Sequence, residues 1–145
     1  MNKDKKILIV GAGSSQTLAI KKINDLGYYS IAIDGDKSAK GLSHASESYI
    51  CDIRDPRELI KISRKLNVDA ITSFSTDVPI KAISEACAYL NLPCMSISQA
   101  SLSVNKYLQR ILLKQNKIYT PKFEKFDSVT AAIELLKKFN SPIVI

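Results

Sequence analysis

The most constraining feature of this 145-residue sequence is a regular alternation of short apolar runs with segments of helical periodicity. Ile7-Leu8-Ile9-Val10 is apolar at every position and leads into Gly11-Ala12-Gly13, which is typical of a strand buried on both faces of a sheet. Segment 16–26 carries apolar residues at helical spacing, and Gly27 follows as a helix-terminating residue. The chain is therefore predicted to begin with a strand, a glycine-rich turn and a helix.

The alternation continues to about residue 100. Further strands are predicted at 29–33, 49–52, 69–74 and 93–96, with helices at 55–66 and 77–91. Asp55 and Pro56 suit the start of the first of these helices, and Glu58 is placed as a capping-box acid. Strands that alternate with helices favour right-handed crossovers and a parallel sheet covered on both faces. We therefore predict a Rossmann-like, doubly wound α/β domain over residues 1–103, with ligands at the carboxyl ends of its strands.

The pattern changes in residues 104–145. The predicted elements are a basic amphipathic helix at 105–115, an extended segment at 120–123, a helix from Asp127 to Phe139, and a strand at 141–145. The last strand is a bare apolar run with no turn after it, which is typical of a sequence cut from a longer protein. We therefore expect residues 104–145 to begin a second, truncated domain.

Composition excludes several classes of protein. The chain is 46% hydrophobic, which is too high for a disordered chain, and it has no apolar run long enough to span a bilayer. Its N-terminus lacks the apolar region of a secretory signal. The sequence therefore predicts a cytoplasmic protein with no membrane partner.

The three cysteines do not suggest a metal site or a disulfide framework. Cys51, Cys87 and Cys94 are odd in number and contain no CxxC pair, and His44 is the only histidine. We therefore predict buried, reduced thiols and no bound metal. Without a second histidine or a paired nucleophile, no acid–base catalytic set can be assembled, so no catalytic residue is assigned.

Positive charge gathers in the last third of the chain. Residues 101–145 carry eight Lys and Arg against three Asp and Glu, whereas residues 1–100 carry thirteen against eleven. Such a segment could meet nucleic acid, a membrane surface or a nucleotide phosphate, or it could be a solvated face. Aromatic residues do not interleave with the lysines as a single-strand-binding surface requires, so nucleic acid is not the expected partner.

The glycine-rich turn at 11–16 stands where a dinucleotide fingerprint would stand, between the first strand and the first helix. Its glycines allow a tight turn and the approach of a ligand to the backbone, and the helix N-terminus favours an anion. Asp34 ends the second strand, as the ribose-binding acid of NAD enzymes does. Gln16, however, replaces the third glycine, which weakens the NAD hypothesis. A turn that serves backbone geometry alone is the alternative.

Two further motifs carry polar groups, each with two interpretations. Ser73-Phe74-Ser75-Thr76-Asp77 follows a strand and suits a polar ligand, but Thr76 or Asp77 could merely cap the next helix. Lys106 lies early in its helix, where the helix dipole disfavours a cation, so it is a candidate for function. A solvated surface lysine is the alternative.

Six segments follow one another along the chain: KKILIVGAGSSQ, LGYYSIAIDGD, ASESYICDIRDP, NVDAITSFSTD, NKYLQRILLKQNKIYTPKF and SPIVI. Their order resembles the ATP-grasp superfamily, most closely the branch of the carbamoyl-phosphate synthase large subunit, biotin carboxylase and the purine-pathway carboxylases. Segment 105–123 is the most specific, since Lys-Tyr-Leu-x-Arg is followed there by a helix and then by Thr-Pro-Lys-Phe. The resemblance covers nearly the whole chain.

This resemblance implies that residues 1–103 are similar to the pre-ATP-grasp domain and residues 104–145 to the first piece of the ATP-grasp module. The family uses ATP and Mg²⁺ to convert a carboxylate or bicarbonate to an acyl phosphate, from which an amine or another nucleophile displaces phosphate. Lys106 matches a lysine that contacts the nucleotide phosphates. The other nucleotide, metal and catalytic residues would lie further on, so this chain alone is expected to be inactive, with no tightly bound cofactor.

In the family, the glycine loop and the strand ends often face the acceptor substrate rather than NAD. The resemblance therefore implies a set of substrate-side candidates: Gly11, Gly13, Ser14, Ser15, Gln16, Asp34, Ser75 and Asp77. The expected partners are a small-molecule substrate and the remainder of the ATP-grasp module, and a homo-oligomer is compatible with the sequence. The alternatives are an NAD(P)-binding Rossmann domain of an oxidoreductase and a non-catalytic module that docks partners through its basic third.

Overall fold

The computed structural model describes residues 5–137 of the chain. The chain divides into two compact units, Met1–Val104 and Asn105–Ile145. The strand predicted at 141–145, and Phe139 as the end of the last predicted helix, lie outside the described residues.

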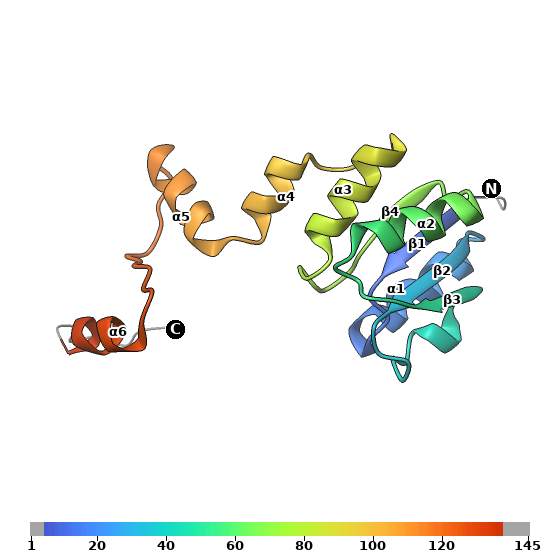
Figure 1. Cartoon of the computed structure of the whole chain (residues 1–145), viewed down its shortest axis with the longest axis horizontal. Helices are drawn as coiled ribbons and strands as arrows, with labels where there is room; N and C mark the ends of the chain where they lie inside the picture. The colour runs from blue at the N-terminus through green and yellow to red at the C-terminus, as the bar shows by residue number, and fades with distance from the viewer. Residues whose placement is uncertain (1–4, 138–145) are drawn as a thin grey trace. The chain divides into compact units, whose positions relative to one another are not determined.

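The first unit contains a four-stranded parallel sheet with strand order β3-β2-β1-β4 (Figure 1). The strands are β1 (Lys6–Val10), β2 (Tyr29–Asp34), β3 (Glu47–Ile50) and β4 (Ala70–Thr72). In register, Leu8 of the central strand β1 stands opposite Ile31 of β2 and Ile71 of β4. The predicted parallel α/β sheet is therefore confirmed, with its first strand in the interior.

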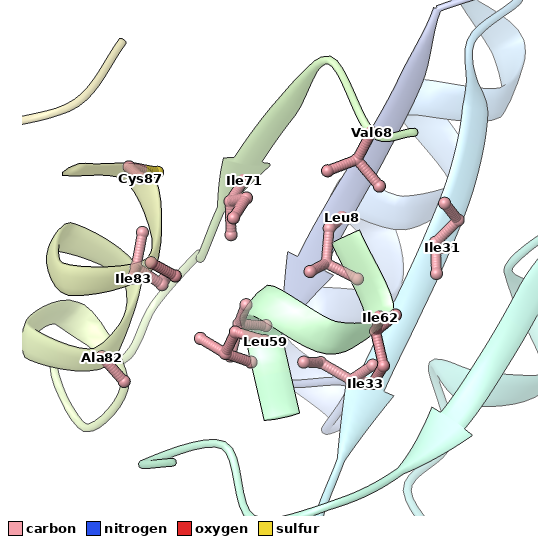
Figure 2. Packing of buried hydrophobic residues seen from close by; sticks show 12 residues of the cluster. Leu8, Ile31, Ile33, Leu59, Ile62, Val68, Ile71, Ala82, Ile83 and Cys87 are labelled. Atoms are coloured by element: carbon pink, nitrogen blue, oxygen red, sulfur yellow. The ribbon is translucent and has the colours of Figure 1, made fainter. Parts of the chain in front are cut away.

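Helices cover both faces of this sheet. The helical segments are α1 (Ser14–Asp25), η1 (Leu42–His44), α2 (Pro56–Leu66), α3 (Ile80–Leu90) and α4 (Ile97–Ser103). Successive side chains of a strand point to opposite faces. Leu8 therefore packs in the cluster formed with α2 and α3 (Figure 2). Ile9 packs on the other face with α1. Leu8 and Ile9 are both fully buried. This two-sided burial is why residues 7–10 are apolar at every position.

The strand order creates a switch point between β1 and β4. The chain runs from β1 to β2 and β3 in one direction across the sheet, and β4 then returns to the other side of β1. In open parallel sheets, ligands bind at the carboxyl ends of the strands at such a point. The two segments that leave these ends are residues 11–13 after β1 and residues 73–79 after β4.

Two local predictions in the first unit are wrong. Residues 93–96 form no strand. Asn91 ends α3 in the left-handed conformation (φ 56°), and Pro93 has no backbone N–H to donate to a neighbouring strand. Ser96 then caps α4 in a capping box with Gln99, so the next helix begins at once. Glu58 does not complete a capping box either. The backbone N–H of Asp55 donates to the carbonyl oxygen of Asp52, whereas Asp55 itself caps α2 as predicted.

The second unit contains α5 (Lys106–Gln115) and α6 (Val129–Leu136). Asn105 caps α5, since its Oδ1 accepts from the backbone N–H of Leu108 at 3.0 Å. Ser128 caps α6 in place of the predicted Asp127, because its Oγ accepts from the backbone N–H of Ala131 at 3.2 Å. No residue of either helix is buried, although both carry apolar side chains at helical spacing.

The prediction of three buried thiols is also wrong for one of them. Cys87 is buried and Cys51 is half-buried, but Cys94 is exposed. The cause is the missing fifth strand, because the segment that holds Cys94 does not join the sheet. All three cysteines are free thiols.

Two buried hydroxyl groups are expected to destabilise the first unit. Ser63 of α2 and Ser84 of α3 are 2% and 1% exposed, and neither Oγ has a hydrogen-bond partner. Ser63→Ala and Ser84→Ala should each raise the free energy of unfolding by about 1–2 kcal/mol, because an unpaired buried hydroxyl is removed. Urea denaturation measures this change. Ser15→Ala, at an exposed position of α1, is the control for helix propensity, and a loss of stability at Ser63 or Ser84 would contradict the expectation.

Candidate ligand site at the carboxyl edge of the sheet

The turn after β1 has a conformation that requires glycine at its first position. Gly11 has a φ of +97°, in the left-handed region, and its backbone N–H donates to the carbonyl oxygen of Ile33 at 2.8 Å. A Cβ at Gly11 would lie 3.6 Å from Cγ2 of Thr76 in the segment after β4. The turn therefore lies against the ends of both neighbouring strands.

Asp34 holds the glycine turn to the end of β2. Its Oδ2 accepts from the backbone N–H of Ala12 at 2.7 Å, and its Oδ1 accepts from the backbone N–H of Asp36 at 2.9 Å. Both carboxylate oxygens therefore have backbone partners within the fold. Asp34 therefore lies at the candidate site, as predicted, and it also holds the backbone of the glycine turn and of the loop after β2 in place.

Gln16 connects the segments that follow β1 and β4. Its side chain is only 7% exposed, and its Nε2 donates to the carbonyl oxygen of Phe74 at 2.5 Å. Ser73 makes a second connection, since its Oγ donates to the carbonyl oxygen of Val10 at 2.7 Å. The residue that replaces the third fingerprint glycine thus fills the space between the two segments and fixes their spacing.

The first turn of α1 presents small hydroxyl side chains to solvent. Gly13 is the N-cap residue and offers no side-chain oxygen, and Ser14 and Ser15 are exposed. A Cβ at Gly13 would lie 3.0 Å from Oε1 of Gln16, which is a tight contact. The helix N-terminus is therefore uncapped by side chains, and its backbone donors favour an anion or a polar ligand atom.

The segment after β4 does not cap the helix that follows it. The N-cap of α3 is Pro79, which makes no side-chain capping bond. Thr76 Oγ1 accepts from the backbone N–H of Val78 at 3.3 Å, before the helix begins, and Asp77 is exposed. Ser75 is also exposed and has a positive φ of 56°, which is uncommon for a residue with a side chain. The capping interpretation of Thr76 and Asp77 is therefore wrong.

Gly41 contributes to the site but was not identified from the sequence. Its backbone N–H donates to the carbonyl oxygen of Ala12 at 2.6 Å. A Cβ at Gly41 would lie 2.6 Å from that oxygen and 2.7 Å from Cδ1 of Ile20. Both distances are shorter than real Cβ contacts, so neighbouring atoms would have to move. The polar loop after β2 thus packs directly on the glycine turn. In the sequence, this contact is signalled only by a glycine inside an irregular segment.

A second hollow lies beside this edge, at the ends of β2 and β3. Its walls include Asp34, Cys51, Asp52 and Arg54. Arg54 Nε and Nη2 each donate to one oxygen of Asp52 at 2.9 Å, and these bonds lower the pKa of Asp52 to about 2. Because this arginine and aspartate neutralise each other, the hollow offers no unpaired charge from this pair.

In the second unit, the most specific sequence motif folds into one local cluster. Arg110 Nη1 donates to Thr120 Oγ1 at 3.1 Å, and the rings of Tyr107 and Phe123 lie 5.8 Å apart in an edge-to-face arrangement. These contacts join α5 to the Thr-Pro-Lys-Phe segment and explain their spacing in the sequence. Lys106 is the first residue of α5 and is exposed, and within residues 5–137 it forms no ion pair.

The substrate-side candidates thus fall into one neighbourhood, and Lys106 belongs to the other unit. Within residues 5–137, no group of three or more His, Cys, Asp or Glu side chains could hold a metal ion. The helices in this part of the chain are also too short or too polar to cross a membrane.

Comparisons with known proteins give matches over nearly the whole chain, although no family model matches it. The formate-dependent phosphoribosylglycinamide formyltransferase of Methanocaldococcus jannaschii is 24% identical over 144 residues, which cover 97% of this chain and 36% of that protein. The phosphoribosylglycinamide synthetase of Anaerococcus prevotii has a similar structure, with a TM-score of 0.73 and 24% identity over 96% of this chain and 36% of its own. The ADP complex of N5-carboxyaminoimidazole synthetase from Staphylococcus aureus gives a TM-score of 0.75 and 18% identity, with 94% and 37% covered.

These matches confirm the predicted fold. The chain spans about a third of the length of the relatives that it matches.

Proposed function

Since the chain is similar in sequence and fold to the N-terminal part of ATP-grasp enzymes, we propose that it supplies the N-terminal part of an ATP-dependent carboxylate–amine, or carboxylate or bicarbonate, ligase. The observation that carries this proposal is a sequence match that covers 97% of this chain but only 36% of the relative. Residues 1–103 would form the pre-ATP-grasp domain, and residues 104–145 would begin the ATP-grasp module. The nucleotide would be ATP, and the acceptor would be a small molecule.

The proposed reaction passes through an acyl phosphate. A carboxylate oxygen attacks the γ-phosphorus of ATP and ADP leaves, after which a nucleophile attacks the acyl carbon and phosphate leaves. Mg²⁺ would neutralise charge on the phosphates when bound. Residues 5–137 contain no suitable ligand cluster, so we derive no metal-binding role for this part of the chain. Its own contribution is to bind and orient.

Lys106 is the proposed nucleotide contact. Its ammonium group lies at the positive end of α5, where a cation is disfavoured, and no carboxylate among the described residues offsets this cost. A bound phosphate would reverse the sign of this interaction. The excess of positive charge in residues 101–145 supports the same assignment.

The acceptor substrate is proposed to bind at the edge between β1 and β4. Support comes from the position of the switch point, from the uncapped start of α1, and from the exposed side chains of Ser14, Ser15, Ser75 and Asp77. Hydroxyl groups and one carboxylate suit a ligand that presents hydroxyl or amino groups. Gly11, Gly13, Gln16 and Asp34 would shape this site rather than recognise the ligand through free side chains.

The NAD(P) alternative has less support. Asp34 stands at the end of β2, but both its carboxylate oxygens accept backbone N–H groups. Gln16 replaces the glycine that brings helix and strand together in dinucleotide-binding folds. Addition of the chain is therefore expected to leave NADPH fluorescence unchanged, and a change would favour the NAD(P) alternative.

The 145-residue chain by itself is expected to bind ATP no more tightly than millimolar and to show no ligase activity. The reason is that it spans only about a third of its relatives, so most of the nucleotide contacts that we propose would lie elsewhere. Titration calorimetry with MgATP measures the affinity, and a phosphate-release assay measures the activity. Micromolar binding would show that the nucleotide site is largely contained in this chain.

A further inference from the structure

Cys87 lies near the end of α3 and takes part in the main hydrophobic cluster of the first unit. Its side chain is fully buried. Ile83 precedes it by four residues, so the two side chains share one face of the helix, and Figure 2 shows them next to each other. This face of α3 points toward β4, where Ile71 belongs to the same cluster.

The chain folds back after α3 and carries Cys94 to this face. Asn91 adopts the left-handed conformation, and the backbone N–H of Leu92 donates to the carbonyl oxygen of Cys87 at 2.9 Å. Cys94 is exposed and lines a hollow together with Ile71 and Ile83. The turn therefore brings a solvent-accessible thiol to the side of the helix on which Cys87 is buried.

Cys87 and Cys94 share two neighbours, since Ile71 and Ile83 pack with Cys87 in the hydrophobic cluster and line the hollow with Cys94. Burial, followed by the adjacent thiol of Cys94, raises the pKa of Cys87 to about 12. Cys87 is therefore a neutral thiol near pH 7, and the surrounding core prevents an oxidant in the solvent from reaching its sulfur directly. An oxidant in the solvent can reach the exposed sulfur of Cys94.

We propose that Cys87 and Cys94 form a redox-active thiol pair that closes to an intramolecular disulfide in the presence of a peroxide. The sulfur of Cys94 attacks one peroxide oxygen, so an S–O bond forms, the O–O bond breaks and water leaves. The sulfur of Cys87 then attacks the resulting sulfenic acid, so the S–S bond forms, the S–O bond breaks and a second water leaves with the Cys87 proton. Two thiols are oxidised, and one hydrogen peroxide is reduced to two waters.

The disulfide would alter a wall of the candidate site. The hollow that Cys94 lines also includes Ser73 and Thr76, which belong to the segment after β4. Cys51, by contrast, lies after β3 and lines the second hollow, and its pKa is raised by burial and then by described groups that are carboxylates and not thiols. It therefore serves as an internal control.

The test treats the 145-residue chain with hydrogen peroxide, alkylates the remaining thiols and digests the protein with chymotrypsin, which can cleave after Tyr89 between the two cysteines. Mass spectrometry should show the Cys87 and Cys94 peptides joined, with the loss of two hydrogen atoms, and Cys51 alkylated. Before oxidation, Cys94 should be alkylated at least about tenfold faster than Cys87.

Three variants separate this proposal from non-specific oxidation. Cys51→Ala should retain the linked peptides, whereas Cys94→Ser and Cys87→Ala should abolish them, with circular dichroism used to verify the fold of each. Because Cys94 is exposed, its variant carries the test even where a change at the buried Cys87 prevents folding. Over-oxidation of Cys94 to sulfinic acid while Cys87 remains alkylatable, or a disulfide that involves Cys51, would overturn the proposal.

Discussion

Lys106→Met in the full-length ligase that we propose is expected to weaken ATP binding or turnover by about 10- to 150-fold. Loss of one charge-assisted contact to phosphate costs roughly 1.5–3 kcal/mol, which corresponds to that factor. Folding should be unharmed or slightly improved, because methionine keeps the apolar stem and removes a cation from the positive end of α5. A steady-state phosphate-release assay, with each substrate varied in turn, measures the effect.

The matched control is Lys114→Met, which removes an exposed lysine from the last turn of the same helix. Its ATP kinetics should stay within about twofold of the unmodified protein, since many exposed charges contribute little. A raised KM for ATP at Lys106→Met with unchanged kcat would assign the contact to the ground state, and a lowered kcat to the transition state. Equal, small effects of the two variants would make Lys106 an ordinary surface residue.

Gly41→Ala is expected to lower the free energy of unfolding by about 2–4 kcal/mol, which is a large effect for one added methyl group. The new Cβ would lie 2.6 Å from a backbone oxygen of the glycine turn, and the backbone cannot rotate away as a side chain can. The loop after β2 or the turn itself must therefore move. Urea denaturation measures the change. The m-value, which is the slope of the unfolding free energy against urea concentration, should stay constant, since the surface exposed on unfolding is similar.

Gly35→Ala is the control for this substitution. A Cβ at Gly35 would meet only the carbonyl oxygen of Cys51, at an ordinary contact distance of 3.7 Å. Its effect should stay within about 0.5 kcal/mol. Similar destabilisation by the two variants would show that the loss comes from glycine removal in general and not from the contact with Ala12.

The sequence predicted the elements that have strong periodicity or clear end signals. Residues 7–10 had to be a strand buried on both faces, and Gly27 had to follow a helix, where it adopts a φ of +83°. The strand predicted at 93–96 is wrong because a short apolar stretch does not show whether a neighbouring strand is available to pair with it. Ser96 and Gln99, three residues apart, were the missed signal that a helix begins there.

The candidate site was predicted as a neighbourhood but not as a set of contacts. Topology places the ends of β1 and β4 together, so the glycine turn and residues 73–77 could be expected to meet. The contact between Gly41 and Ala12 depends on how an irregular loop folds back, which no periodicity encodes. The same holds for Gln16, whose position in the turn suggests a ligand contact, whereas its side chain donates to the carbonyl oxygen of Phe74.

The bond from Gln16 to Phe74 also constrains how specificity at this edge could be transferred between relatives. Gln16 belongs to one segment of the site and its acceptor to the other, and Ser73 ties them a second time at Val10. Grafting only the glycine turn from a relative would leave its residue at position 16 facing a backbone carbonyl whose position is set by the segment that was not exchanged. Residues 11–16 and 73–77 should therefore be exchanged as one cassette, and inherited as one by any recombination that changes the substrate.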